Sequence, residues 1–302
     1  MSEMAACPHM GAKAYDLRRD TLEIIMAGGG GHIGGDMSEM EILVTLYGRM
    51  NVSPQNQDSP DRDRFVLSKG HCVESLYAVL SWKGFLDINE VKAKFSKFGS
   101  EYIGHPHNTI PGIEMNSGSL GHGLSVCVGM ALAGKMDKRN YRVYTLMGDG
   151  ELAEGSVWEG ATAAGHFKLD NLCAVIDHNH LQISGRIEDV MNPGDLRKRF
   201  EATNWHVIDV KDGNSIEQLN AAFDEAERTK GCPTVIIAET VKGKGSALIE
   251  NKASWHHKLP SQEEYLQIAA DFAAKKAGGN AAHPCASAGT KTSCLSEVLL
   301  NA

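Results

Sequence analysis

The stretch "YRVYTLMGDG", residues 141–150, joins a run of mostly apolar residues to a Gly-Asp-Gly sequence. An apolar run of this kind, ended by turn residues, is typical of a parallel strand that is buried on both faces. The two glycines allow the chain to turn tightly and to approach a ligand closely. We therefore expect Asp149 to lie at the carboxyl end of a buried strand and to face a crevice.

The rest of the chain alternates similar apolar runs with amphipathic segments. Three more candidate strands lie at residues 171–177, 206–210 and 233–240. Apolar residues recur at helical spacing in three other segments, at residues 40–47, 120–131 and 216–226. This alternation predicts an α/β fold, a doubly wound and mostly parallel sheet with helices on both faces and ligands at the carboxyl ends of its strands.

Composition and charge exclude several classes of function. The 302 residues carry a net charge of -8 and no run of basic residues, which argues against nucleic acid or an acidic membrane surface as a partner. No signal pattern opens the chain and no apolar stretch approaches the roughly 20 residues that span a bilayer, so a cytoplasmic protein is expected. The seven cysteines form no CxxC pair and are expected to be reduced.

The pattern also predicts the domain organisation. Residues 1–11 are expected to form an N-terminal arm, and residues 12–271 a single domain. Residues 272–302 are rich in Ala, Gly, Ser and Thr and contain little that could be buried, so we expect a flexible C-terminal tail.

A second strand end carries polar residues that complement Asp149. The run "VIDHNHLQISG" places Asp177, His178 and Asn179 at the end of the strand at residues 171–177. If the two strands are neighbours, the Asp149 carboxylate and the Asn179 amide oxygen can reach one point. Oxygen ligands of this kind suit a hard cation such as Mg²⁺ or Ca²⁺.

The span from Gly148 to Gly185 resembles the thiamine diphosphate binding motif of the transketolase family. Four other segments resemble transketolase motifs in the same order, namely "GGGGHIGGDMS", "LSKGH", "YIGHPH" and "NSGSLGHGLSVCVGMALA". The resemblance covers roughly residues 12 to 265 and implies the thiamine diphosphate-binding fold. It also implies a divalent ion, Mg²⁺ or alternatively Ca²⁺ or Mn²⁺, held by Asp149, Asn179 and the main-chain carbonyl of Leu181.

The same resemblance assigns the cofactor-binding residues. It places eleven residues at thiamine diphosphate or its ion, namely His71, Gly118, Ser119, Leu120, Gly148, Asp149, Gly150, Glu151, Asn179, Leu181 and Lys244. For Glu151 the helix dipole alone would explain an acid after the turn. Lys244 follows a buried strand in "ETVKGKG" and is a candidate to neutralise the diphosphate, although an exposed basic turn is an equal alternative.

The catalytic residues are implied by the resemblance as well. His32, His71, His105 and His256 correspond to the imidazoles of the substrate channel, where a pKa near neutrality suits proton exchange with sugar oxygens. His256 is preferred to the adjacent His257 because Trp-His fits the family pattern better. Glu154 and Glu159 correspond to acids that run toward the partner active site.

The resemblance implies a two-chain enzyme. A transketolase transfers a two-carbon ketol unit from a ketose phosphate to an aldose phosphate, and it also needs a pyrimidine-binding domain that this sequence does not contain. The expected partner is a separate C-terminal transketolase subunit, in an α₂β₂ heterotetramer that acts in carbohydrate metabolism. The alternatives are the α-type subunit of a 2-oxoacid dehydrogenase and a non-catalytic thiamine diphosphate-binding protein.

Overall fold

The structure, a computed structural model, describes residues 9–281 and centres on a five-stranded sheet. The strand order is β1-β2-β3-β7-β6, and every neighbouring pair is parallel. The bounds are β1 Arg64–Leu67, β2 Val143–Gly148, β3 Leu172–His178, β6 His206–Val210 and β7 Thr234–Glu239. A separate antiparallel pair is formed by β4, Leu181–Gln182, and β5, Gly185–Arg186. The predicted strands and the predicted parallel sheet are confirmed.

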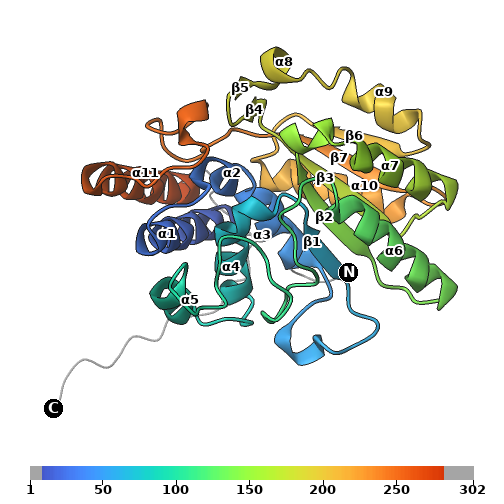
Figure 1. Ribbon diagram of the computed structural model, residues 1–302, viewed down its shortest axis with the longest axis horizontal. Helices are drawn as coiled ribbons and strands as arrows, with labels where there is room; N and C mark the ends of the chain where they lie inside the picture. Colours follow the sequence, from blue (N-terminus) through green and yellow to red (C-terminus); the bar gives the residue numbers. More distant parts are fainter. Residues whose placement is uncertain (1–8, 282–302) are drawn as a thin grey trace, which may run out of the picture.

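Helices cover both faces of this sheet, as Figure 1 shows. Side chains of β2 alternate between the two cores: Tyr144 and Leu146 face one, Val143 and Met147 the other. The first core includes residues of α1, α3, α4 and α10, and the second includes residues of α6, α7 and α9. Strands enclosed on both sides in this way need apolar residues at successive positions, which explains the apolar runs in the sequence.

The helices have the following bounds: α1 Met10–Gly28, α2 Ile33–Ser38, α3 Met40–Arg49, α4 Val73–Trp82, α5 Ile88–Lys94, α6 Gly123–Met136, α7 Gly155–His166, α8 Ile187–Val190, α9 Leu196–Glu201, α10 Ile216–Arg228 and α11 Gln262–Ala281. Short 3₁₀ helices lie at η2 Pro54–Asn56, η3 Gly70–Cys72, η4 Gly150–Ala153 and η5 Ala253–Trp255. Within residues 9–281, no helix is long and apolar enough to cross a membrane.

The predicted domain boundaries need adjustment at both ends. Helix α11 lies beside α1 (Figure 1) and continues to Ala281, past the predicted boundary at residue 271. It continues because Phe272 is buried in a third apolar cluster with Leu22 and Ile25 of α1, and its ring lies 6.3 Å from that of Tyr15. At the other end, α1 begins at Met10, inside the predicted arm. Residues 1–8 and 282–302 lie outside the described residues.

The carboxyl ends of three neighbouring strands meet at one edge of the sheet. In the register, Gly148 pairs with Asp177, and His178 pairs with Glu239. The residues that follow these strand ends therefore converge, which is the position where open α/β sheets bind ligands.

Candidate active site at the strand carboxyl ends

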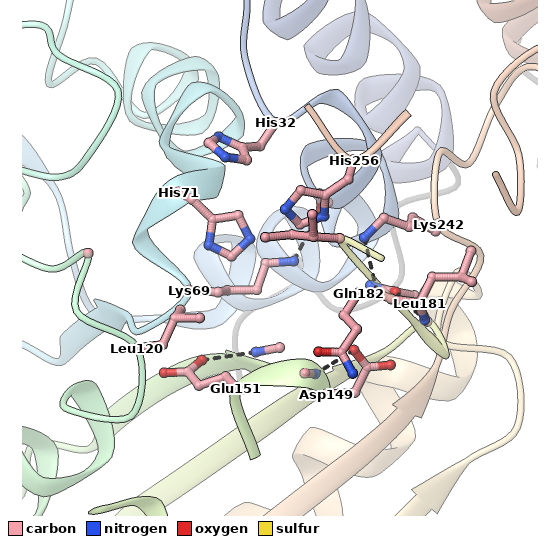
Figure 2. Close-up of a pocket in the computed structure, with 16 residues that line it drawn as sticks. His32, Lys69, His71, Leu120, Asp149, Glu151, Leu181, Gln182, Lys242 and His256 are labelled. Atoms are coloured by element: carbon pink, nitrogen blue, oxygen red, sulfur yellow. Dashed lines mark hydrogen bonds between the residues drawn. The ribbon is translucent and has the colours of Figure 1, made fainter. Parts of the chain in front are cut away.

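A cavity of about 270 Å³ opens at these strand ends. It is lined by residues from seven separate segments of the chain, namely His32, Gly35, Lys69, His71, Gly118, Leu120, Gly148, Asp149, Gly150, Glu151, Asn179, Leu181, Gln182, Ile183, Lys242 and His256. In Figure 2 the three histidines gather on one side, Asp149 and Glu151 lie on the other, and Lys69 and Lys242 lie between them. Most of the predicted cofactor residues are therefore brought to one place.

Asp149 lies directly after β2, where the sequence predicted it. Its carboxylate accepts hydrogen bonds from the backbone N–H of Gly150, at 2.8 Å, and from that of His180, at 2.5 Å. The residue is only 3% exposed, yet it lines the cavity. The Gly-Asp-Gly turn thus fixes a carboxylate whose remaining lone pairs are available to a ligand.

Asn179 and Leu181 complete a set of oxygen donors with Asp149. The Asn179 amide nitrogen donates to Asp177 Oδ2 at 3.1 Å, and this contact fixes the side chain so that its amide oxygen accepts from the Leu181 N–H, at 3.2 Å. The Leu181 carbonyl accepts a hydrogen bond from Lys242 Nζ at 3.1 Å. A carboxylate, an amide oxygen and a carbonyl oxygen are ligands that suit a hard divalent cation, and a cationic ammonium already contacts one of them.

Lys242, rather than Lys244, is the lysine of this cavity. Lys242 is buried and lines it, whereas Lys244 is partly exposed and does not contribute to its lining. The chain turns between the two lysines at Gly243, whose φ of 74° is left-handed. Burial, followed by the charge of Lys69, lowers the pKa of Lys242. The structure thus brings Lys242, and not the predicted Lys244, into the cavity lining, and a contact of Lys244 with the cofactor stays a prediction.

Glu151 holds three segments of the site together by hydrogen bonds, so the helix dipole is not the only reason for an acid at this position. It lies in η4, ahead of α7, and is buried. Its carboxylate accepts hydrogen bonds from Gly121 N–H at 2.8 Å, from Gly148 N–H at 3.1 Å and from the Ser68 hydroxyl. Burial raises the pKa of Glu151. One side chain therefore joins the ends of β1 and β2 to the loop before α6.

A buried ion cluster that the sequence did not reveal supports the floor of the cavity. Lys69, 2% exposed, contacts Asp177 Oδ2 at 2.5 Å and Glu39 Oε2 at 2.9 Å. Burial is the largest single effect and acts to lower the pKa of Lys69, but the neighbouring charges, led by Asp177, together with the hydrogen bond to Asp177 outweigh it and the pKa is raised. Lys69 stands in the motif "LSKGH" and Asp177 ends a predicted strand, so both positions were visible in the sequence, although their contact was not.

Three of the predicted catalytic histidines form one cluster. The ring centroid of His32 lies 4.9 Å from that of His71 and 5.4 Å from that of His256. Burial lowers the pKa of His32 to about 4, that of His71 to about 2 and that of His256 to about 3. The three imidazoles are therefore neutral at pH 7, each able both to donate and to accept a hydrogen bond. A histidine pKa near neutrality, as expected from the sequence, does not hold here.

The structure separates His256 from its neighbour. His256 lines the cavity, and its buried Nδ1 has no hydrogen-bond partner among the described residues. His257 is exposed, although its ring centroid lies 4.6 Å from that of His32. The geometry thus favours His256, as the sequence pattern did.

The remaining predicted residues lie around the cavity instead of in its lining. His105 is exposed, but its ring packs against Gly118, where an added Cβ would lie 2.7 Å from the ring and where φ is 146°, so this position requires glycine. Ser119 is exposed. Glu154 and Glu159 are exposed at the start of α7 and on its surface, so their role toward a partner chain stays a prediction.

Comparison with known proteins identifies the family. Residues 12–276 match the family described as transketolase, thiamine diphosphate binding domain. The chain belongs to the transketolase family. It is 48% identical over 249 residues to an apulose-4-phosphate transketolase subunit from Phocaeicola vulgatus, a match that covers 82% of this chain and 88% of that protein. It is 39% identical over 263 residues to the 6-deoxy-6-sulfo-D-fructose transketolase subunit SqwG of Clostridium sp. (strain MSTE9), covering 86% and 94% of the two chains.

A solved structure shares the fold. Transketolase from Leishmania mexicana superposes with a TM-score of 0.80 at 29% identity, and the match covers 91% of this chain and 45% of that one. The prediction of a transketolase enzyme that carries the thiamine diphosphate binding domain is confirmed. The comparisons favour it over the 2-oxoacid dehydrogenase alternative.

Proposed function

We propose that this chain is the diphosphate-binding subunit of a two-chain transketolase, which transfers a two-carbon ketol unit from a ketose phosphate to an aldose phosphate. The observation that carries the proposal is the cavity itself, where a set of oxygen donors faces a cluster of neutral histidines at the carboxyl ends of β2, β3 and β7. When bound there, thiamine diphosphate supplies a thiazolium carbanion and then acts as an electron sink.

The oxygen donors fit the ion that would accompany a diphosphate. Asp149, Asn179 and the Leu181 carbonyl offer three hard ligands, which leaves other positions of Mg²⁺ for phosphate oxygens and water. Lys242 contacts Leu181 and lines the same cavity, so its ammonium is placed to pair with a phosphate. Glu151 and Lys69 hold the segments that carry these ligands, through the contacts described above. The same donors would accept Ca²⁺ or Mn²⁺.

The histidines are suited to handling the polar end of a sugar. A neutral imidazole can accept a proton from a hydroxyl or donate one to a carbonyl oxygen without first losing a charge. Low pKa values keep His32, His71 and His256 neutral throughout the physiological range. His105, exposed beside Gly118 of the cavity lining, is the fourth imidazole in this proposal.

A separate C-terminal subunit would complete the site. Support comes from the two relatives named as subunits, which this chain covers over 88% and 94% of their length. Ile183 lines the cavity although it is 74% exposed, so the cavity borders apolar surface that a second chain could cover. The proposed assembly is α₂β₂, in the cytoplasm. The exposed Glu154 and Glu159 are proposed to face the partner.

The test is a ketol-transfer assay on the full chain, on the partner chain, and on the two together, with thiamine diphosphate and Mg²⁺ present. Only the mixture is expected to turn over. Asp149→Asn in the mixture should abolish activity, while Asp137→Asn, at an exposed position after α6, should keep it. Robust turnover by this chain alone would contradict the two-chain proposal, and unchanged activity of Asp149→Asn would contradict the assignment of the ion ligand.

A further inference from the structure

A second group of metal-ligating side chains lies outside the cavity, at the ends of β3 and β7. His178 ends β3, His180 follows two residues later, and Glu239 ends β7. His178 and Glu239 are partners in the sheet register, so the fold places them side by side. His180 has a left-handed φ of 62°, and the centroid of its ring lies 4.0 Å from the centroid of the His178 ring.

The three side chains present their ligand atoms to one point. His180 Nε2 lies 2.6 Å from Glu239 Oε2, and His178 Nε2 lies 3.7 Å from Glu239 Oε1. All three ligand atoms lie within 4.8 Å of one another. Zinc bonds of about 2.0–2.1 Å in tetrahedral geometry place neighbouring ligand atoms about 3.3–3.5 Å apart. The observed distances lie on both sides of that value, so small side-chain rotations suffice.

Both histidines have a carboxylate behind the other ring nitrogen. His178 Nδ1 lies 3.3 Å from Asp149 Oδ2, and His180 Nδ1 lies 3.5 Å from Glu188 Oε1. His178 Nδ1 is also buried without a hydrogen bond among the described residues. Metal-binding histidines characteristically donate their second N–H to a carboxylate, which fixes the ring and makes the ligand nitrogen more basic.

We propose that His178, His180 and Glu239 bind one divalent transition ion of the Zn²⁺ class, with water in the remaining position. Two imidazole nitrogens and one carboxylate select such an ion over Mg²⁺, which prefers oxygen ligands. This centre is separate from the proposed cofactor ion. Asp149 connects the two, because its carboxylate lines the cavity and also approaches His178.

Solvent can deliver the ion to this position. The side chains of His180 and Glu239 are 38% and 42% exposed, and that of His178 is 15% exposed. An ion held there cross-links the ends of two neighbouring strands. Binding is therefore expected to raise the melting temperature of the chain, because the ion binds the folded state in preference to the unfolded one.

The chain contains a matched control. His206 Nε2 lies 2.7 Å from Glu225 Oε1, which is nearly the same contact as that between His180 and Glu239. Among the residues that the structure describes, however, this pair is not part of a three-ligand group. A His-Glu pair by itself should not bind the ion tightly.

The test is titration of the full chain with Co²⁺, a spectroscopic substitute for Zn²⁺, in excess Mg²⁺ and without thiamine diphosphate. The expected result is one Co²⁺ per chain with visible bands typical of nitrogen and oxygen ligands, displaced by Zn²⁺. His180→Ala and Glu239→Gln should each weaken binding by more than about 100-fold, since loss of even an outer contact costs 10–100-fold. His206→Ala should bind as the unchanged chain does.

Three outcomes would overturn the proposal: no Co²⁺ binding in excess Mg²⁺, equal affinity in all the variants, or a spectrum typical of cysteine thiolate. Both substituted residues are well exposed, so the variants are expected to fold, and melting curves recorded without metal check this. Because no step requires the cofactor or the partner chain, failure here leaves the proposed ketol-transfer function intact.

Discussion

Replacing Lys69 by methionine should strongly destabilise the chain. Methionine keeps most of the volume of the side chain but removes the ammonium that contacts Asp177 at 2.5 Å and Glu39 at 2.9 Å. Removal of one partner from a buried ion pair typically costs about 3–5 kcal/mol, because the other charge stays buried without compensation.

The two carboxylates contribute differently to this cost. Burial raises the pKa of Glu39 to about 8, so this acid can take up a proton at modest cost. Asp177 has a lowered pKa, because Lys69 and its other hydrogen bonds outweigh the effect of burial. It keeps hydrogen bonds from Ser38, Asn179 and Thr240 after the substitution. We therefore expect the free energy of unfolding to fall by about 3–5 kcal/mol and not by twice that amount.

Lys92 provides the matched control. It also bridges two carboxylates, Asp20 at 2.6 Å and Glu23 at 2.7 Å, but it lies at the surface with a side chain 21% exposed. Lys92→Met should cost only about 0–1 kcal/mol. The assay is equilibrium unfolding in urea, monitored by circular dichroism, for both variants and the unchanged chain. If the two variants lose stability equally, the argument that burial makes the Lys69 cluster important is wrong.

Three further predictions concern the cavity. Lys242→Met should weaken thiamine diphosphate binding in the reconstituted two-chain enzyme by roughly 10-fold or more, while Lys244→Met should have little effect. Calorimetry measures both affinities. If Lys244→Met weakens binding more than Lys242→Met does, Lys244 is the phosphate contact. His71→Ala should lower turnover by roughly 10²-fold or more with little change in melting temperature, since the ring lines the cavity. A variant that melts at a lower temperature but keeps its specific activity would show that the His71 ring serves packing and not catalysis. The free energy of unfolding should fall as the pH drops from 6.5 toward 4, because burial lowers the pKa of His32 from 6.5 to about 4 and only the unfolded chain takes up that proton in this window. Unfolding at a series of pH values should show a shallower slope for His32→Asn, and an identical slope would refute the pKa shift.

The parts of the fold predicted well from the sequence are those that a buried parallel sheet imposes on composition. Strands β2, β3, β6 and β7 appear as apolar runs because side chains on both faces are covered. Strand β1, Arg64–Leu67, was missed because its four residues are too few to show a pattern. The extension of α11 was missed because its Ala-rich sequence is stabilised by tertiary packing of Phe272 and not by a strong amphipathic pattern.

In the candidate site, the sequence indicated the residues at strand ends but not the contacts between distant segments. Asp149 and Asn179 were placed at this edge because each directly follows a strand end, a position that topology fixes, whereas Leu181, which begins β4, was assigned from the family resemblance alone. The contact between Lys69 and Asp177 joins residues 108 positions apart, and no local pattern reports such a pair. The choice between Lys242 and Lys244 depends on the backbone turn at Gly243, which the sequence "VKGKG" leaves open. The bonding role of Glu151 was likewise hidden by its resemblance to an ordinary acid after a turn.

The measurement that tests the central claim most directly is a crystal structure of this chain with its partner, thiamine diphosphate and Mn²⁺, recorded at a wavelength where manganese scatters anomalously. The account predicts an anomalous peak bonded to Asp149, Asn179 and the Leu181 carbonyl, with the diphosphate beside Lys242 and the thiazolium ring facing His32, His71 and His256. A peak or a diphosphate elsewhere in the chain, with the cavity at the ends of β2 and β3 empty, would contradict it.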